Sequence, residues 1–221
     1  MRAVEKCSGR ICAIADVDAL QPVPLPAAVQ DMAEAGIRWI QVRAKRLSGS
    51  DLFQQVEACC RKLEGSGVQL WVDDRADIAS LLPVAGLHVG QSDLPPTAAR
   101  RVVGPGIWIG LSTHTEEQLL QAAADPEVDV IAVGPIFPTT GKEKPEAVVG
   151  LELLRWARSH TEKPIVAIGG IGAANAGEVI AAGADTVAVI GAICRGGGDI
   201  RTRALRLLAA AAGNAEPCGS I

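Results

Sequence analysis

Two apolar stretches late in the chain decide its fold: Pro164–Gly170 reads PIVAIGG, and Thr186–Ile193 reads TVAVIGAI. Neither stretch alternates between apolar and polar residues, and both are rich in β-branched side chains. Strands that are buried on both faces have this composition, because helices cover the outside of a parallel sheet. A helical pattern at Asn175–Ala182 separates the two stretches. They therefore predict two parallel strands joined by a crossover helix.

The same rhythm extends through the rest of the chain. Eight strands are predicted, at Ile11–Asp16, Trp39–Lys45, Val68–Asp74, Gly86–Gly90, Trp108–Ser112, Asp129–Phe137, Pro164–Gly170 and Thr186–Ile193. The segments between and after them read as helices, among them Ser50–Leu63, Thr115–Ala124, Gly150–Ser159, Asn175–Ala182 and Arg201–Ala212. Eight such units without a linker predict a single (β/α)₈ TIM barrel of the α/β class. An open doubly wound sheet is the alternative, but the GxGxxG turn typical of it is absent.

Length and composition fit one domain. The chain has 221 residues, of which 48% are apolar and 21% charged, and its formal net charge is −4. This size suits one barrel, which we place at residues 1–213, with a frayed tail at residues 214–221. The chain lacks the basic footprint of a nucleic-acid-binding protein, although a local cluster of cations could still bind anionic small molecules.

The chain carries neither a secretory core at its N-terminus nor an apolar run of ~18 residues, so we expect no membrane partner. It has six cysteines, at Cys7, Cys12, Cys59, Cys60, Cys194 and Cys218. Two of them are adjacent and none forms a CxxC pair, which is a poor start for a disulfide framework. We expect free thiols and a cytoplasmic protein.

The predicted second strand carries a polar stripe. Residues Trp39–Lys45 read WIQVRAK, so Gln41, Arg43 and Lys45 share one face and apolar side chains occupy the other. A strand of a parallel barrel has no solvated face, and buried cations without a counter-charge are costly. The pattern therefore predicts that the three polar side chains point into the barrel mouth, where an anionic ligand neutralises the cations.

Acidic residues end the next two strands. Asp73 and Asp74 close the third strand, and Asp93 follows the fourth. Carboxylates at neighbouring strand ends could share Mg²⁺ with water and phosphate oxygens. They could equally cap the helices that follow, because Asp is a favoured N-cap residue. Spacing alone leaves both interpretations open.

The fifth strand ends in Ser112-Thr113-His114. Adjacent serine and histidine rarely form a working nucleophilic pair, and no nucleophile-elbow motif surrounds them, so the hydroxyls are expected to bind a ligand. His88 lies in an apolar run and reads as a core histidine. His160 falls at the predicted C-terminus of a helix, where a cation is favourable.

The remaining polar signals point to a phosphate. After the sixth strand, Thr139, Thr140, Gly141 and Lys142 bring hydroxyls, a glycine and a cation onto one loop. Glycines also follow the last two strands, at Gly170 and in the Ile190–Gly191 pair, where barrels often bind phosphate through backbone N–H groups. The alternative is that these glycines only ease tight turns.

Seven stretches together resemble the thiamine-phosphate synthase family, between about Ile11 and Ile193. They are QVRAK, DDRADIA, GLHVGQSDLP, IGLSTH, GPIFPTTGK, PIVAIGGI and GADTVAVIGAI, and they occur in the family's order, one at each strand end. The resemblance implies a transferase that joins hydroxymethylpyrimidine diphosphate to thiazole phosphate and releases diphosphate. Such chemistry needs cations and Mg²⁺ where negative charge accumulates, and it needs no nucleophilic side chain.

The resemblance also assigns residues. It implies that the diphosphate substrate is held by Gln41, Arg43, Lys45, Ser112 and Lys142, with Asp73 beside the pyrimidine. It implies that Asp74 and Asp93 ligate Mg²⁺, and that the thiazole phosphate meets Thr139, Thr140, Gly141, Gly170, Ile190 and Gly191. The catalytic set would be Arg43, Lys45, Ser112 and Lys142.

Three positions depart from the family pattern. The family usually has Asn where this chain has Asp73, Thr where it has Gly141, and Ser where it has Gly191. Two of these changes remove hydroxyls from the thiazole side. The identity of the thiazole substrate is therefore the part of the prediction that has the least support in the sequence.

Two alternatives stay open at this stage. A related thiazole tautomerase, an isomerase on the same barrel, uses a histidine at a position like His114. Arg43, Lys45 and Lys142 argue against it, because an isomerase holds no diphosphate leaving group. A non-catalytic relative that binds phosphorylated ligands is the second alternative. A homo-oligomer is compatible with the sequence, which does not specify its state.

Overall fold

Eight parallel strands pair in chain order and close on themselves in the computed structural model, which describes residues 9–139, 147–196 and 199–212. The strands are β1 (Ile11–Asp16), β2 (Trp39–Arg43), β3 (Gln69–Asp73), β4 (Gly86–Val89), β5 (Trp108–Thr113), β6 (Val130–Val133), β7 (Ile165–Ile168) and β8 (Thr186–Val189). Pairing of β1 with β8 closes the barrel, with Ile11 opposite Val187. The predicted (β/α)₈ barrel is confirmed, and the open sheet is excluded.

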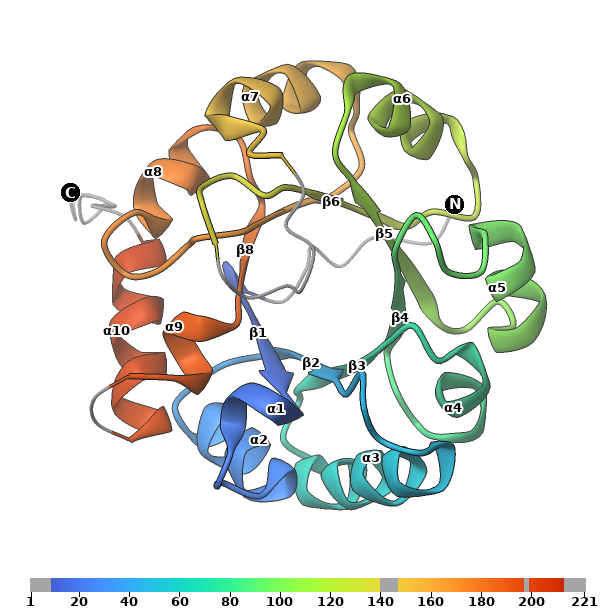
Figure 1. The fold of residues 1–221 in the computed structure, drawn as a ribbon, viewed down its shortest axis with the longest axis vertical. Helices are drawn as coiled ribbons and strands as arrows, with labels where there is room; N and C mark the ends of the chain where they lie inside the picture. The colour runs from blue at the N-terminus through green and yellow to red at the C-terminus, as the bar shows by residue number, and fades with distance from the viewer. Residues whose placement is uncertain (1–8, 140–146, 197–198, 213–221) are drawn as a thin grey trace, which may run out of the picture.

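Helices surround the barrel in the order of the chain (Figure 1). They are α1 (Val17–Leu20), α2 (Leu25–Glu34), α3 (Gly49–Leu63), α4 (Ala76–Leu81), α5 (Pro96–Val103), α6 (Glu116–Ala124), α7 (Gly150–His160), α8 (Ala176–Ala181), α9 (Gly191–Cys194) and α10 (Ile200–Ala212). Their apolar faces pack on the outward side chains of the strands and form the main hydrophobic core. None of these helices is both long and apolar enough to cross a membrane, within the described residues.

A second, smaller core fills the inside of the barrel. It contains Trp39 and Trp71, whose ring centroids lie 4.8 Å apart, together with small and aliphatic side chains. Gly86 makes room for the indole of Trp71, because a Cβ at this glycine would lie 2.3 Å from the ring. Bulk on one strand is thus matched by a glycine on its neighbour.

Several strands end earlier than the sequence predicted. Strand β6 stops at Val133 rather than at Phe137, because Pro135 has no N–H with which to continue the ladder. Strand β8 stops at Val189, and the glycine that was assigned to it begins helix α9 instead. Strand β7 ends at Ile168, since Gly169 and Gly170 adopt positive φ values of 104° and 64°. Each early end leaves more residues in the loops at the carboxyl ends of the strands.

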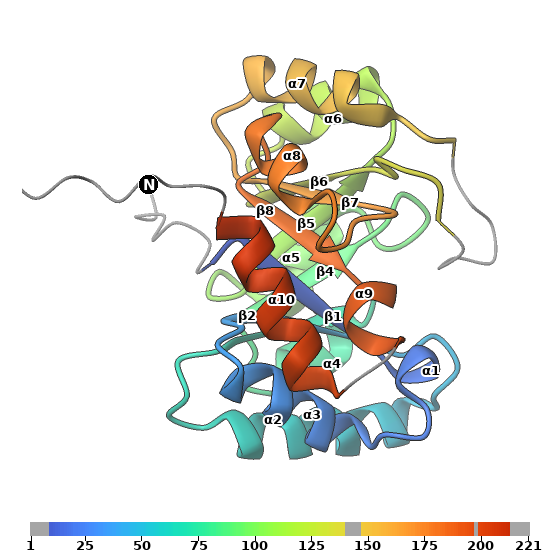
Figure 2. The ribbon, with the colours of Figure 1, turned by 90° about the vertical axis from the view of Figure 1, so that its left-hand side faces the viewer.

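Those loops gather at one end of the barrel. Figure 2 shows α1 and α9, which follow β1 and β8, side by side at this end, and the two helices are in contact. The four described cysteines, Cys12, Cys59, Cys60 and Cys194, are thiols outside any disulfide, as predicted, while Cys7, Cys218 and the tail lie outside the described residues. Burial raises the pKa of Cys59 to about 12 and that of Cys194 to about 11, so both thiols stay protonated near neutral pH.

Candidate active site

A cavity of about 640 Å³ opens among the carboxyl ends of the strands. It is lined by most of the residues that the sequence analysis singled out, namely Gln41, Arg43, Lys45, Asp73, Asp74, Asp93, Ser112 and Ile190. Thr139, Gly170 and Gly191 are not part of this lining, and Thr140, Gly141 and Lys142 lie outside the described residues. The predicted pyrimidine and metal residues therefore converge, whereas the predicted thiazole residues are only partly brought to the cavity.

A larger hollow lies at the opposite end of the barrel, where the strands begin. The cations that line this hollow bind other groups of the protein. Arg100 pairs with Glu127 and with Asp129, and the Lys163 ammonium donates to the carbonyls of Ala122, at 2.9 Å, and Asp125. Arg158 likewise pairs with Asp185, and Arg10 donates to the carbonyl of Ala211, which leaves the carboxyl-end cavity as the candidate site.

The polar stripe of β2 points into the cavity, as predicted. Gln41 is 5% exposed, and side-chain exposure rises along the stripe to 45% at Lys45, where the chain has left the strand. Both cations also have carboxylate partners that the sequence analysis did not foresee. Arg43 donates from Nη1 to Asp16 and has Nε 3.7 Å from Asp73 Oδ2, while Lys45 donates to Asp74. The chain itself therefore supplies counter-charges that had been expected from a ligand.

Asp16 is the functional candidate that sequence reasoning missed. It ends β1 directly opposite Arg43 in the register of β1 and β2, and it is 4% exposed. One oxygen accepts the N–H of Ala19, which caps helix α1. The signal was present in the sequence as an acid at the end of an apolar strand, but it was taken for an ordinary strand end.

Asp74 has a strained backbone at the mouth. Its φ is 62°, and no other described residue apart from glycine has a positive φ. This conformation costs about 1–3 kcal/mol for a side chain other than glycine, and such strain is concentrated at functional sites. It aims the carboxylate at Lys45. Burial raises the pKa of Asp74, the bond from Lys45 opposes that rise, and the negative charge of Asp93 adds to it.

The helix-capping alternative for these acids fails. Helix α4 begins after Arg75, without a side-chain cap, and helix α5 begins after Pro95, again without one. Asp93 instead accepts the N–H of Gly90 at 2.8 Å, inside its own loop. Among the residues that the structure describes, no three acidic, histidine or cysteine groups come together as a complete metal site. Any ion held by Asp74 and Asp93 would need ligands from water or substrate.

Ser112 is paired with a histidine from the neighbouring strand. His88 Nε2 lies 2.9 Å from Ser112 Oγ, whereas His114 Nδ1 lies 2.6 Å from the carbonyl oxygen of Gly134. The sequence predicts a core histidine at His88, but the structure places it on the cavity wall. Gly110, opposite His88 in the register, makes this possible, because a Cβ there would lie 2.7 Å from His88 Nδ1. His160 ends α7 as predicted.

The floor of the cavity is apolar apart from one indole. Trp39 lines it and is 2% exposed, and among the described residues no group accepts a hydrogen bond from its Nε1. Small side chains such as Ala132 and Ala188 surround it. A flat ring fits such a floor better than a phosphate does, because an anion placed there would lose its hydration without gaining a cation.

Comparison with known proteins settles the relationship. The family model described as thiamine monophosphate synthase matches residues 11–193 of this chain. The chain belongs to this family. A thiamine-phosphate synthase of Koribacter versatilis is 44% identical over 185 residues, which cover 82% of this chain and 87% of that protein. A thiamine-phosphate synthase of Methanocella arvoryzae is 45% identical over 154 residues, covering 70% of this chain and 72% of that protein.

Solved structures agree with this family membership. A thiamine phosphate pyrophosphorylase from Pyrococcus furiosus superposes with a TM-score of 0.82 at 30% identity, covering 92% of this chain and 95% of that one. An orotidine 5'-phosphate decarboxylase from Pyrococcus horikoshii superposes with a TM-score of 0.65 at 18% identity, covering 92% of this chain and 99% of that one. The second likeness concerns the barrel alone.

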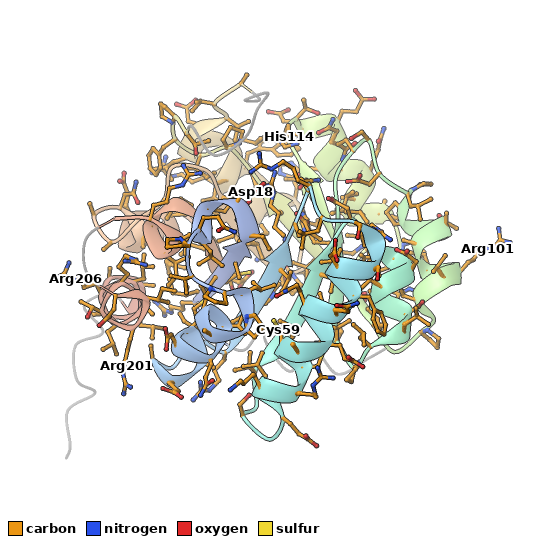
Figure 3. All side chains as sticks on the ribbon, turned by 60° about the horizontal axis from the view of Figure 1, so that its bottom comes forward. Asp18, Cys59, Arg101, His114, Arg201 and Arg206 are labelled. Atoms are coloured by element: carbon orange, nitrogen blue, oxygen red, sulfur yellow. The ribbon has the colours of Figure 1, made fainter. Side chains whose placement is uncertain are left out.

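The described part of this site is acidic before any ligand binds. With histidines neutral, the charged side chains that line the mouth, together with Asp16 behind Arg43, carry a formal charge of −2, from two cations and four carboxylates, namely Arg43, Lys45, Asp16, Asp73, Asp74 and Asp93. Other arginines do not change this balance. In Figure 3, Arg101, Arg201 and Arg206 project from the outer helices, while Asp18 and His114 lie at the end that carries the cavity.

Proposed function

We propose that this protein condenses hydroxymethylpyrimidine diphosphate with thiazole phosphate and releases thiamine phosphate and diphosphate. Membership of the synthase family supports a transferase of this kind. The single observation that carries the proposal is the cavity itself, which combines an apolar floor, an amide and two cations with a pair of acids. A heteroaromatic ring that carries a diphosphate has matching parts: a flat ring for the floor and a polyanion for the mouth.

The pair of acids supports a Mg²⁺ ion in this site. Asp74 and Asp93 offer hard oxygen ligands, and Mg²⁺ is commonly held by one or two carboxylates together with substrate phosphates. The formal charge of −2 at the mouth opposes a diphosphate until a divalent cation offsets it. When bound, Mg²⁺ would neutralise charge on the leaving diphosphate. The strained backbone of Asp74 is consistent with a carboxylate held in place for such an ion.

The side chains of the cavity have two tasks in this reaction. In the first step the bond between the pyrimidine methylene carbon and the diphosphate oxygen breaks, and its electron pair leaves with the oxygen. Arg43, Lys45 and the Ser112 hydroxyl stabilise that growing charge, and Lys142, outside the described residues, is assigned to the same task. In the second step the thiazole nitrogen donates its lone pair to the carbon, so the remaining task is to hold the two substrates in line.

The thiazole phosphate is assigned to the opposite rim of the mouth. Ile190 lines the cavity there, and Gly191 begins helix α9 beside it. Thr139 and Gly170 complete the assignment with Thr140 and Gly141. With two hydroxyls of the family pattern missing, we expect a working enzyme that has a raised KM for the thiazole phosphate.

The two alternative functions gain no support. The Koribacter versatilis and Methanocella arvoryzae relatives are named thiamine-phosphate synthases, and the Pyrococcus furiosus structure is named a thiamine phosphate pyrophosphorylase. The pair of acids beside two cations also has no task in an isomerase. We also propose a cytoplasmic location, which is supported by the absence of disulfides among the described cysteines. A homo-oligomer remains part of the proposal, to be measured by light scattering after gel filtration.

One assay tests the proposed function. Purified protein is mixed with both substrates and Mg²⁺, and thiamine phosphate and diphosphate are measured as products. We expect the two products in equal amounts, and none of either in the presence of EDTA. An Arg43→Ala variant serves as the negative control. Binding of both substrates without product would favour the non-catalytic relative, and conversion of the thiazole phosphate alone would favour the isomerase.

A further inference from the structure

The structure assigns a positioning role to Asp16, which holds the Arg43 guanidinium in the orientation that receives the diphosphate. This inference rests on the proposed function, since it names a further residue of the same site. It concerns a residue that does not line the cavity and so acts through its neighbour.

The hydrogen bonds of Arg43 show how its orientation is fixed. Its Nη1 donates to Asp16, and its Nε lies 3.7 Å from Asp73 Oδ2. No described residue accepts a hydrogen bond from Nη2. A guanidinium is planar, so fixing Nη1 and Nε determines where the third nitrogen, Nη2, points. Nη2 belongs to a side chain that lines the cavity and is 17% exposed.

Asp16 is itself rigidly held. Its side chain is 6% exposed, and Oδ1 accepts the N–H of Ala19 at 2.9 Å while Oδ2 accepts from Arg43. Among the described residues, Arg43 is the one cation that pairs with Asp16. Because the backbone fixes one side of Asp16, its carboxylate stays in place. It therefore keeps the Arg43 guanidinium from moving with the diphosphate as it leaves.

Substitution by asparagine separates positioning from helix capping. Asn caps helices as well as Asp does, but it has one acceptor oxygen where Asp has two. If that oxygen caps Ala19, the amide N–H₂ group of the Asp16→Asn variant faces the N–H donors of Arg43, and the support is lost. The matched control is Asp18→Asn, in the helix that Asp16 caps, because Asp18 pairs with Arg46 on the surface.

The expected result is specific to one substrate. We expect Asp16→Asn to lower kcat/KM for the pyrimidine diphosphate about tenfold to a hundredfold, with the thiazole KM unchanged. Asp18→Asn should match the wild type. In an Arg43→Ala background, Asp16→Asn should cause no further loss, because its effect passes through Arg43. A raised KM for the thiazole phosphate, or a further loss in that background, would show a purely structural role and overturn the inference.

A second measurement does not depend on turnover. Calorimetry with inorganic diphosphate and Mg²⁺ should show weaker binding by Asp16→Asn than by the wild type or by Asp18→Asn. Equal affinities, or no binding by any of the three proteins, would overturn the inference about Asp16. Failure of the proposed function is a different outcome, in which the wild type binds diphosphate but forms no thiamine phosphate.

Discussion

The negative charge of Asp73 opposes the binding of the pyrimidine diphosphate in the proposed reaction. Its Oδ1 accepts a hydrogen bond from Gln41 at 3.2 Å, and its Oδ2 lies 3.7 Å from Arg43. An ionised carboxylate occupies donors that the substrate also needs, and it cannot donate to a ring nitrogen as an amide can. We therefore expect Asp73→Asn to lower the KM for the pyrimidine diphosphate or to raise kcat, as measured by steady-state kinetics. Asp77→Asn, at an exposed position on α4, is the control.

The opposite outcome at Asp73 would be equally clear. A tenfold loss of activity in Asp73→Asn would show that the acid has a task of its own here, for example as a further ligand to the metal. Asp73 would then have to be grouped with Asp74 and Asp93, and the charge argument at this position would be wrong.

Gly191 offers a second test on the thiazole side. A Cβ built on this glycine meets no atom within 4 Å, and its φ is not positive, so a serine fits without strain. A hydrogen bond to a charged group is worth about 1.5–3 kcal/mol, or roughly one to two powers of ten in affinity. We expect Gly191→Ser to lower the KM for the thiazole phosphate and to leave that for the pyrimidine unchanged.

Gly106→Ser is the matched control for this variant, because that glycine also has open space and lies before β5, far from α9 in the chain. Loss of activity in Gly191→Ser would indicate that a bulkier ligand occupies the space, and the second substrate would then differ from the usual thiazole phosphate.

Residue types and their faces could be predicted from the sequence, but their partners could not. The alternation of Gln41, Arg43 and Lys45 followed from a period of two, which any strand imposes. The pairing of Arg43 with Asp16 depends on the register between β1 and β2, which places these two residues opposite each other. No local pattern encodes that register, and so Asp16 was missed and an external anion was expected instead.

At the scale of elements, the register of β4 and β5 determines the Ser112–His88 contact. Gly110 lies opposite His88, and a Cβ there would approach His88 Nδ1 to 2.7 Å and the indole of Trp71 to 3.2 Å. We expect Gly110→Ala to displace the imidazole from Ser112 and to lower kcat, together with a loss of stability of about 1–3 kcal/mol from overpacking. Kinetics and thermal unfolding measure the two effects.

The control for Gly110→Ala is Gly106→Ala, where the added methyl group meets nothing within 4 Å. If Gly110→Ala unfolds at the same temperature as the wild type and retains full activity, the cavity wall is looser than the structure indicates and His88 does not depend on this glycine.

Element ends were the weakest part of the sequence prediction, for a physical reason. The run from Asp129 to Phe137 is apolar throughout except at its first residue, and apolarity alone does not separate a strand from the loop that follows it. Pro135 removes the donor that would continue β6 in register, and Ile136 and Phe137 then donate irregularly to the carbonyls of Ile168 and Gly169, at 2.9 and 3.0 Å. The same holds for β8, where residues of one apolar run divide between a strand and helix α9.

For the whole molecule, eight repeated units were enough to predict the barrel, because closure follows from their number and order. Closure also explains why the site is built from residues far apart in the chain: the carboxyl ends of all eight strands meet at one rim. Three acids and two cations line the cavity there, with Asp16 behind Arg43, although other arginines, such as Arg101, Arg201 and Arg206, lie on the outer helices. The local charge of the mouth therefore matters more for function than the net charge of −4.

This charge balance leads to a prediction about metal dependence. With a formal charge of −2 on its described residues, the mouth should bind inorganic diphosphate in Mg²⁺ and show no measurable binding in EDTA, as followed by calorimetry. Removing either proposed metal ligand should lower turnover. Asp74→Ala or Asp93→Ala should reduce turnover at least about a hundredfold while the fold is kept, because Lewis-acid stabilisation is worth several kcal/mol. Asp77→Ala should retain activity. Diphosphate affinity that is equal in Mg²⁺ and in EDTA would contradict the metal site, and the two carboxylates would then need another explanation.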